Sequence, residues 1–302
     1  MLQVLLSGLA VGAVYGLVGM GFAIAFYVTR VINFAEGQLL MVSVMVAAAV
    51  ARSGMSPAIA MLCGILAAGA VGVVTYLVAV RPVLAFDRFS FAWLVSTLGV
   101  ALILENLAAI IWGTTSLSFP RLLSGSSVHL GGATLSWQEV LTIGVGLALA
   151  AAFEVVRKRT FFGKVGMAIA YDPEMAAAIG ANTFLFAVVA FAAAGVFAGV
   201  AGVMIGPLTY ANPYLGDTYG IAGFVALMIG GTERPVGAMV GGLLLGVLNE
   251  GAKHVINTQA SDWFPFVVVV VILLLVPEGL FSVGPRFRSI GRRALRPEGA
   301  TS

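Results

Sequence analysis

The chain has 302 residues, of which 60% are hydrophobic and only 10% carry a charge. A soluble domain carries about 25% charged residues, so this composition excludes an ordinary soluble fold. The formal net charge is +3, but the charged residues lie in the gaps between long uncharged runs. The net charge therefore does not indicate affinity for nucleic acid. Cys63 is the only cysteine, which excludes an intramolecular disulfide and a cysteine metal cluster.

Long uncharged runs predict helices that cross a membrane. Met1–Thr29, Ser53–Val80 and Met175–Gly216 contain no Asp, Glu, Lys, Arg or His. A bilayer core needs about 20 apolar residues per helix, and only helices or closed barrels satisfy a lipid-buried backbone. These runs are too long and continuous for barrel strands. We therefore predict an all-α fold, a polytopic transmembrane helix bundle of eight or nine spans, as one domain over residues 1–302.

Nine segments are expected to span the membrane, and the first is interpreted as a span rather than a removed signal peptide. They are Met1–Tyr27, Gly37–Ala51, Met55–Val80, Phe89–Trp112, Trp137–Val156, Asn182–Leu208, Asp217–Gly231, Val236–Ile256 and Trp263–Phe281. Gly37–Ala51 and Asp217–Gly231 are short, so either one is a candidate for a re-entrant or sharply tilted segment.

The basic residues indicate the orientation. When successive connections alternate between the two sides, thirteen of the sixteen Lys and Arg residues fall on one face, and only Arg52, Arg121 and Lys253 fall on the other. Lys and Arg concentrate on the cytoplasmic side of membrane proteins. This places the basic tail 282–302 in the cytoplasm and, with nine spans, the N-terminus outside. If one short segment is re-entrant, the N-terminal side inverts.

The connection 157–181 is expected on the cytoplasmic side. Asp172-Pro173-Glu174 is a helix-start signal, with Pro at the first turn and acidic residues near the positive helix end. Met175–Ile179 then predicts a short amphipathic helix, which Gly180-Ala181-Asn182 ends. Two interpretations remain open: a plain connector on the membrane surface, or a docking helix for a cytoplasmic partner.

Motifs for catalysis are missing from the sequence. Gly163-Lys164 lacks the upstream glycine and the hydroxyl residue of a phosphate-binding loop, and neither HExxH nor GxSxG occurs. His129 and His254 stand alone and are interpreted as polar interface residues. We therefore predict that the chain is not an enzyme and holds no cofactor or metal of its own.

Polar residues within apolar spans are costly to bury in lipid, which makes them candidates for a transport pathway. Glu250 and Lys253 stand one turn apart, as either a structural ion pair or a pathway lining. Asn212-Pro213 indicates either a broken helix that lines a cavity or a plain external loop. Asn33 and Glu36 are expected to flank the cytoplasmic start of the second span. The pathway or gating candidates are Asn33, Glu36, Glu105, Asn106, Asn212, Pro213, Glu250 and Lys253.

Over nearly its whole length, the chain resembles one family, the integral permeases of branched-chain amino acid ABC importers of the LivH type. Val31–Gly37 is similar to the family's N-F-A-x-G segment, Gly163–Asn182 to its ATPase-docking loop, and Pro277–Phe281 to its P-x-G-L-F close. Two segments depart from the family. Glu36-Gly37-Gln38 stands where His-Gly-Glu is usual, and Thr232-Glu233-Arg234-Pro235 stands where Gly-Ser is usual.

The resemblance implies a permease subunit in a bacterial cytoplasmic (inner) membrane. Its implied partners are a homologous second permease subunit, two cytoplasmic ATPase subunits that bind ATP and Mg, and an external solute-binding protein. The implied solutes are branched-chain or related amino acids, and urea or amides for some relatives. The residues that would couple the chain to the ATPases are Gly163, Lys164, Tyr171, Asp172, Glu174, Ala176, Ala177 and Gly180.

Two other classes compete with this interpretation. An ion-coupled secondary transporter of a small polar solute would use Glu105, Glu250 or Asp217 for protons or sodium, but it needs no cytoplasmic docking helix. A membrane scaffold would explain the repeated glycines at spacings of four, such as Gly8 and Gly12, through close helix packing. A scaffold would not explain the ordered segments that resemble the permeases.

Overall fold

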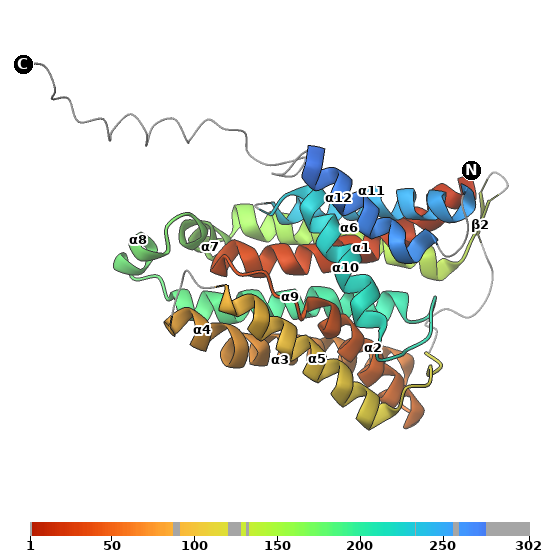
Figure 1. The fold of residues 1–302 in the computed structure, drawn as a ribbon, viewed down its shortest axis with the longest axis horizontal. Coiled ribbons are helices and arrows are strands. Elements are labelled where there is room, and N and C mark those ends of the chain that lie inside the picture. Colours follow the sequence, from red (N-terminus) through yellow and green to blue (C-terminus); the bar gives the residue numbers. More distant parts are fainter. Residues whose placement is uncertain are drawn as a thin grey trace, which may run out of the picture.

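The structure is a computed structural model that describes residues 2–86, 91–119, 128–130, 133–232, 234–255 and 260–275. Within these residues the chain forms helices and one small hairpin (Figure 1). The helices are α1 (Leu2–Thr29), α2 (Glu36–Arg52), α3 (Pro57–Thr75), the π-helix η1 (Tyr76–Val80), α4 (Arg81–Phe86), α5 (Ala92–Trp112), α6 (Trp137–Arg159), α7 (Phe161–Tyr171), α8 (Pro173–Ala178), α9 (Thr183–Ile205), α10 (Leu215–Gly230), α11 (Pro235–Val255) and α12 (Ala260–Leu275). The antiparallel strands are β1 (Val128–Leu130) and β2 (Ala133–Leu135).

Helix α1 lies at the centre of the bundle. Its residues from Ala10 to Ala25 are nearly all buried, and it packs against α11, α9, α10 and α6. Helices α2, α3 and α9 pack together on another side. Figure 1 shows α1, α3 and α9 lying lengthwise in the bundle, while α10 crosses them steeply. The predicted all-helical bundle is confirmed, with the addition of the hairpin.

Six helices in the described residues are long and apolar enough to cross a membrane: α1, the continuous run Pro57–Phe86, α5, α6, α9 and α11. Helices α2 and α10 are shorter, with 17 and 16 residues, as predicted from the sequence. Helix α12 coincides with the start of the predicted ninth span. The rest of that span, the family-like segment Pro277–Phe281 and the basic tail 282–302 lie outside the described residues.

Helices α2 and α10 are short because both begin inside the bundle. The Glu36 carboxyl at the start of α2 lies against Gly21 of α1, well inside that helix. The first turns of α2 and α10 touch through their backbones, since a Cβ at Gly37 would overlap the Gly216 carbonyl oxygen. Glu36 begins α2, the second predicted span, and the cytoplasmic placement of Asn33 and Glu36 stays a prediction. Residues 30–35 fold back into the protein, and both side chains are fully buried.

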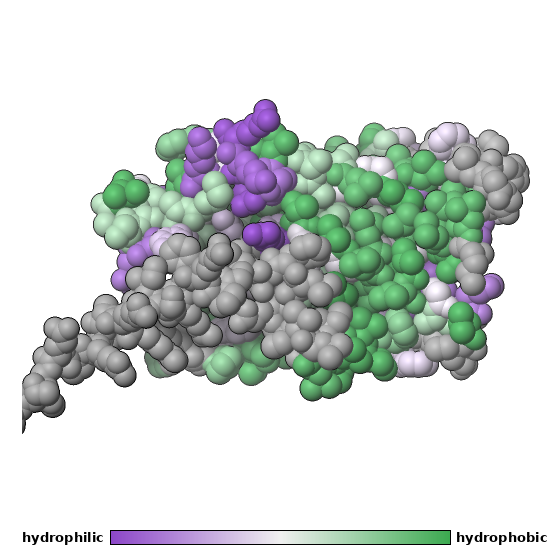
Figure 2. All heavy atoms as spheres, turned by 90° about the horizontal axis from the view of Figure 1, so that it is seen from above, coloured by the Kyte–Doolittle hydropathy of each residue, from purple (hydrophilic) through white to green (hydrophobic). Residues whose placement is uncertain are grey.

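The two ends of the bundle are distinct. One end, here the α8 end, carries α7 and α8 with the last turns of α1 and α6. The opposite end, here the hairpin end, carries β1 and β2, and the Gln3 side chain of α1 exchanges hydrogen bonds of 2.9 and 2.8 Å with the backbone of Thr134. On the face in Figure 2 most exposed side chains are hydrophobic, and the largest hydrophilic group lies toward the α8 end.

The described basic residues divide between the two ends as the sequence predicts. Arg52 at the close of α2 and Lys253 near the close of α11 lie toward the hairpin end. The basic residues at the α8 end are Arg30, Arg81, Arg157, Lys158, Arg159, Lys164 and Arg234. Helix α3 runs antiparallel to α9, and α11 runs antiparallel to α1, which agrees with this division.

Candidate functional site

Asn33 and Glu36 form a buried polar pair at the start of α2. The Asn33 Nδ2 group donates to Glu36 Oε2 at 3.2 Å, and Asn33 Oδ1 accepts from the Ala35 amide at 3.2 Å. The second carboxyl oxygen, Glu36 Oε1, is buried without a hydrogen-bond partner near Gly21 and the Ala194 carbonyl. Burying a polar atom without a hydrogen-bond partner is costly, and such an atom in a native structure calls for an explanation. The pair therefore stays among the gating candidates.

A second polar group joins α2, α5 and α10. Gln38 Nε2 donates to Asp217 Oδ1 at 2.8 Å, and Asp217 interacts in turn with the carboxyl group of Glu105. Asn106, the neighbour of Glu105, is exposed and donates to the Leu102 carbonyl at 2.8 Å within its own helix. The sequence placed Glu105 and Asn106 within a span correctly, but Gln38 was not among its candidates.

A third polar group lies between α1, α10 and α11. Asn249 is fully buried, and its Nδ2 group donates to the Tyr15 hydroxyl at 3.1 Å. The Tyr15 ring lies 5.9 Å from the ring of Tyr219. Glu250 and Lys253 form a half-buried ion pair on α11, as their spacing predicted. The two charges balance each other within the pair, and the choice between a structural role and a pathway lining stays open.

Asn212 and Pro213 lie in the turn between α9 and α10. Asn212 Oδ1 accepts from the Tyr214 amide at 3.0 Å, and Pro213 is buried. The neighbouring Ala211 exchanges backbone hydrogen bonds of 2.7 and 3.0 Å with Leu117. The turn is a fixed part of the fold that delivers the chain to the inner start of α10.

The predicted short helix is present as α8. Asp172 Oδ1 accepts from the amides of Glu174 and Met175 at 3.0 and 2.9 Å, which satisfies two N-terminal amides of the helix. Gly180, with φ of +94°, ends it, and the Ala181 amide donates to the Ala176 carbonyl at 3.0 Å. Ala176 is buried, whereas Ala177 and Glu174 are exposed.

Large apolar side chains around α8 are exposed. Tyr171, Met175 and Ile179 are 85%, 67% and 79% exposed. Met175 and Ile179 stand one turn apart, and Tyr171 closes the preceding helix. Apolar side chains that cluster on an exposed projection are typical of a surface that binds another protein.

Helix α7 links α8 to the bundle, and the sequence did not predict it. Gly163 makes the turn from α6 possible, because a Cβ there would overlap the carbonyl oxygens of Val156 and Arg157. The next residue, Lys164, is exposed. Phe162 of α7 stacks on Phe186 of α9 with ring centroids 4.3 Å apart, which fixes α7 against the bundle.

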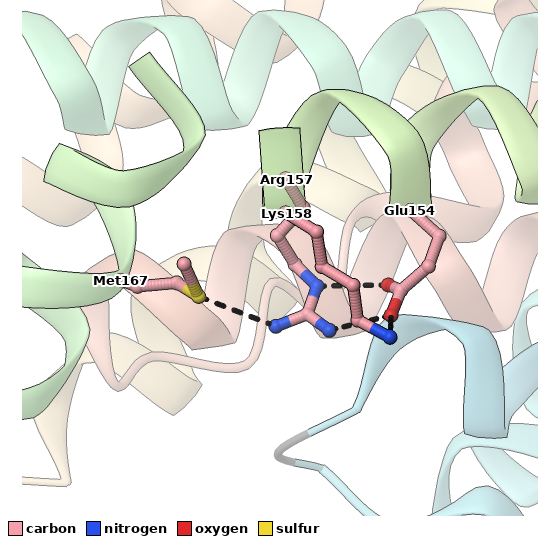
Figure 3. A network of polar contacts seen from close by, with 4 residues as sticks. All are labelled: Glu154, Arg157, Lys158 and Met167. Carbon is pink, nitrogen blue, oxygen red and sulfur yellow. Dashed lines mark hydrogen bonds and ion pairs between the residues drawn. The ribbon is translucent and has the colours of Figure 1, made fainter. Parts of the chain in front are cut away.

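An ionic network at the end of α6 reaches the same helix (Figure 3). Arg157 makes two hydrogen bonds of 2.7 and 2.8 Å to Glu154, and Lys158 Nζ lies 2.8 Å from the same carboxyl group. Arg157 Nη1 also lies 3.6 Å from the sulfur of Met167 in α7, and Arg157 interacts with Tyr27 of α1. The network therefore ties together α1, α6 and α7.

The structure thus collects the coupling candidates at the α8 end and divides the pathway candidates among separate polar groups within the bundle. Among the described residues, no group of three or more His, Cys, Asp or Glu side chains is arranged to hold a metal ion.

Comparison with known proteins gives the family. Residues 4–276 match the family described as branched-chain amino acid transport system, permease component. The chain is 30% identical to the high-affinity branched-chain amino acid transport system permease protein LivH of Salmonella typhimurium, over 92% of this chain and 94% of LivH. It is 29% identical to BraD of Pseudomonas aeruginosa, over 92% of this chain and 95% of BraD. The ribose import permease protein RbsC of Escherichia coli is 27% identical, over 85% of this chain and 78% of RbsC.

No solved structure matches the chain. The family match covers most of the sequence, and it decides between the classes left open above: the chain is a transport subunit rather than an enzyme, and the secondary carrier and the scaffold lose their support. The chain belongs to the family of permease components of branched-chain amino acid transport systems.

Proposed function

We propose that this chain is the membrane subunit of an ATP-driven importer that translocates branched-chain or related amino acids. An external binding protein delivers the solute, a homologous second permease completes the pathway, and two cytoplasmic ATPase subunits bind ATP and Mg. The family match and the names of its relatives support the transport role and the solute class. The observation that supports coupling to the ATPases is the capped helix α8 with its exposed apolar side chains.

Helix α8 has the features that a docking element requires. It is capped at both ends, so it keeps its shape while projecting from the bundle. Its exposed Met175 and Ile179 are available to contact a partner, while its buried Ala176 packs against the rest of the chain. The concentration of basic residues at this end supports a cytoplasmic orientation in the inner membrane, which is the side where ATPases bind.

Contacts at the α8 end provide a route for movement. Helix α8 is joined to α7 at Asp172, and α7 contacts α1 through the hydrogen bond from Arg30 Nη2 to the Ala170 carbonyl. Arg30 begins the segment that returns into the bundle and carries Asn33 and Glu36. A push on α8 by closing ATPases would therefore reach the buried start of α2. Transport then follows from two arrangements of the bundle, each stabilised by a different partner state.

A single arginine on α8 tests this docking role. Ala177→Arg adds a long charged side chain at the exposed face of the helix, so it should abolish ATP-driven uptake while the protein remains in the membrane. Ala85→Arg, an equivalent change at an exposed position of α4, is the matched control and should retain uptake. Co-purification of the ATPase subunits with each variant gives the second measurement. Normal uptake and normal co-purification with Ala177→Arg would refute docking at α8.

A further inference from the structure

The polar group formed by Gln38, Glu105 and Asp217 has an excess of acceptor oxygens and, among the residues that the structure describes, no basic partner. The helices that supply it are α2, α5 and α10, and their only basic residue is Arg52, at the far end of α2. Lys253 on α11 is paired with Glu250, so that lysine is engaged elsewhere. Two adjacent carboxyl groups repel each other when both are ionised, and either a proton shared between them or a positive charge beside them relieves the repulsion.

An unsatisfied acceptor lies in the same group. Gln38 is only 2% exposed and uses its Nε2 group to hold Asp217, while its Oε1 atom is buried without a hydrogen-bond partner. A buried amide oxygen in this state normally has a partner, in protein or ligand. The position of Gln38 is fixed by the backbone contact between Gly37 and Gly216, which sets the first turns of α2 and α10 side by side.

The position of a carboxyl group in its helix favours a negative charge at Asp217 but not at Glu105. Asp217 stands in the first turn of α10, where the helix dipole stabilises a carboxylate. Glu105 lies in the interior of α5, far from either helix end, so the dipole of its own helix gives it no such support. Asp217 therefore lies where its helix favours a carboxylate, and Glu105 and Gln38 Oε1 add acceptors beside it.

The group is also accessible from outside the subunit. Asp217, Thr218 and Asn106 are exposed, and Glu105 is half-buried. Around them α5 presents exposed apolar residues, including Leu102 at 62% and Ile103 at 59%. Charged side chains at this depth are costly in lipid, and they mark a solute path or a subunit interface.

We propose that Glu105, Asp217 and Gln38 form a subsite on the translocation path for the primary ammonium group of the solute. An alkylammonium offers three N–H donors and one positive charge, which match two carboxyl groups and one amide oxygen. An amino acid that passes α5 would bind here through its amino end. This inference rests on the proposed function and names the part of the solute that the permease recognises.

Cysteine labelling tests the subsite without relying on transport. Thr218→Cys in a Cys63→Ser background places a thiol beside Asp217 in the full chain in native membranes. Its reaction rates with the cationic 2-aminoethyl and the anionic 2-sulfonatoethyl methanethiosulfonates give a ratio, which is normalised to that of Ser53→Cys in the exposed α2–α3 turn. A fixed negative group at this distance should raise the normalised ratio about tenfold. Adding Glu105→Gln and Asp217→Asn should return it to that of the control.

Protection by solute analogues identifies the ligand class. Leucine and 3-methylbutylamine, which carry an ammonium group, should slow labelling of Thr218→Cys, whereas 4-methylpentanoate, which lacks one, should not. A normalised ratio equal to that of the control, or protection by 4-methylpentanoate as well, would overturn the proposal. Protection by sodium ions but by neither amine would also overturn it, in favour of an inorganic cation site.

Uptake separates a failure of this inference from a failure of the proposed function. Proteoliposomes with the complete importer and leucine-loaded binding protein should lose leucine uptake at least about tenfold with Asp217→Asn or Glu105→Gln. Wild-type uptake without any loss in the variants would refute the subsite alone. Absence of ATP-dependent uptake by the wild type would refute the proposed function, while the labelling result would still decide whether an ammonium subsite exists.

Discussion

The guanidinium group of Arg30 donates a 2.7 Å hydrogen bond to the main-chain carbonyl of Ala170 and so joins the end of α1 to the last turn of α7. Arg30 has a positive φ of 59°, which is unusual for a residue with a side chain. The backbone turns there toward the buried Asn33 and Glu36. This contact is one of the links between the α7–α8 region and the rest of the bundle.

Removing this contact should weaken coupling. A hydrogen bond from a charged donor contributes about 1.5–3 kcal/mol, so Arg30→Ala should lower ATP-driven uptake roughly tenfold while the ATPase subunits still bind. Uptake per permease molecule and co-purified ATPase are the measurements. Arg159→Ala, an exposed arginine at the same end, serves as the control and should keep full uptake. Equal uptake in the two variants would show that the Arg30–Ala170 contact does not transmit movement.

Glu250 and Lys253 should behave as a structural pair. Their side chains are 19% and 28% exposed, so removing one charge leaves the other half-buried and unpaired. Glu250→Gln or Lys253→Gln alone should reduce the amount of folded protein in the membrane several-fold, and the double variant should restore most of it. Quantitative immunoblots of membranes measure this. Single variants that reach wild-type amounts but fail to transport would assign the pair to the pathway instead.

The seam between α1 and α11 should tolerate no added methyl group. A Cβ at Gly246 would overlap the backbone of Gly8 and Gly12, whereas a Cβ at Gly251 in the same helix would meet nothing within 4 Å. Gly246→Ala should therefore destabilise the detergent-solubilised protein by about 1–3 kcal/mol. Gly251→Ala should be neutral or stabilising, because alanine favours a helix. Thermal unfolding that gave the same midpoint for both variants would contradict the packing of this seam.

The sequence predicted the helix bundle and the short helix at Asp172–Gly180 because both depend on local signals. Uncharged runs define spans without reference to neighbours, and the Asp172-Pro173-Glu174 signal is complete within three residues. Helix α7 was missed because its two glycines, Gly163 and Gly166, and its mixed polarity resemble a connector. Its helical form depends on the cap at Thr160 and on the stacking of Phe162 on Phe186, a contact that no local pattern reveals.

The sequence also did not predict that α2 begins inside the bundle. From their position after Arg30, the sequence placed Asn33 and Glu36 at the cytoplasmic start of the second span, and their burial was not predicted. Only the contacts with α1, α9 and α10 show that the segment returns into the bundle. A signal did exist in the departure from the family at Glu36-Gly37-Gln38, since two of those residues supply the buried polar groups. The partner of Gln38 lies on α10, 179 residues away, and this pairing could not be read from spacing.

The most direct test of the whole account is uptake of labelled leucine by vesicles that contain this chain, its second permease and its binding protein, with and without the ATPase subunits. The account predicts uptake that requires the ATPases and ATP and that persists when the proton gradient is collapsed. Uptake by the permease subunits alone that disappears with the proton gradient would contradict it and would indicate an ion-coupled carrier.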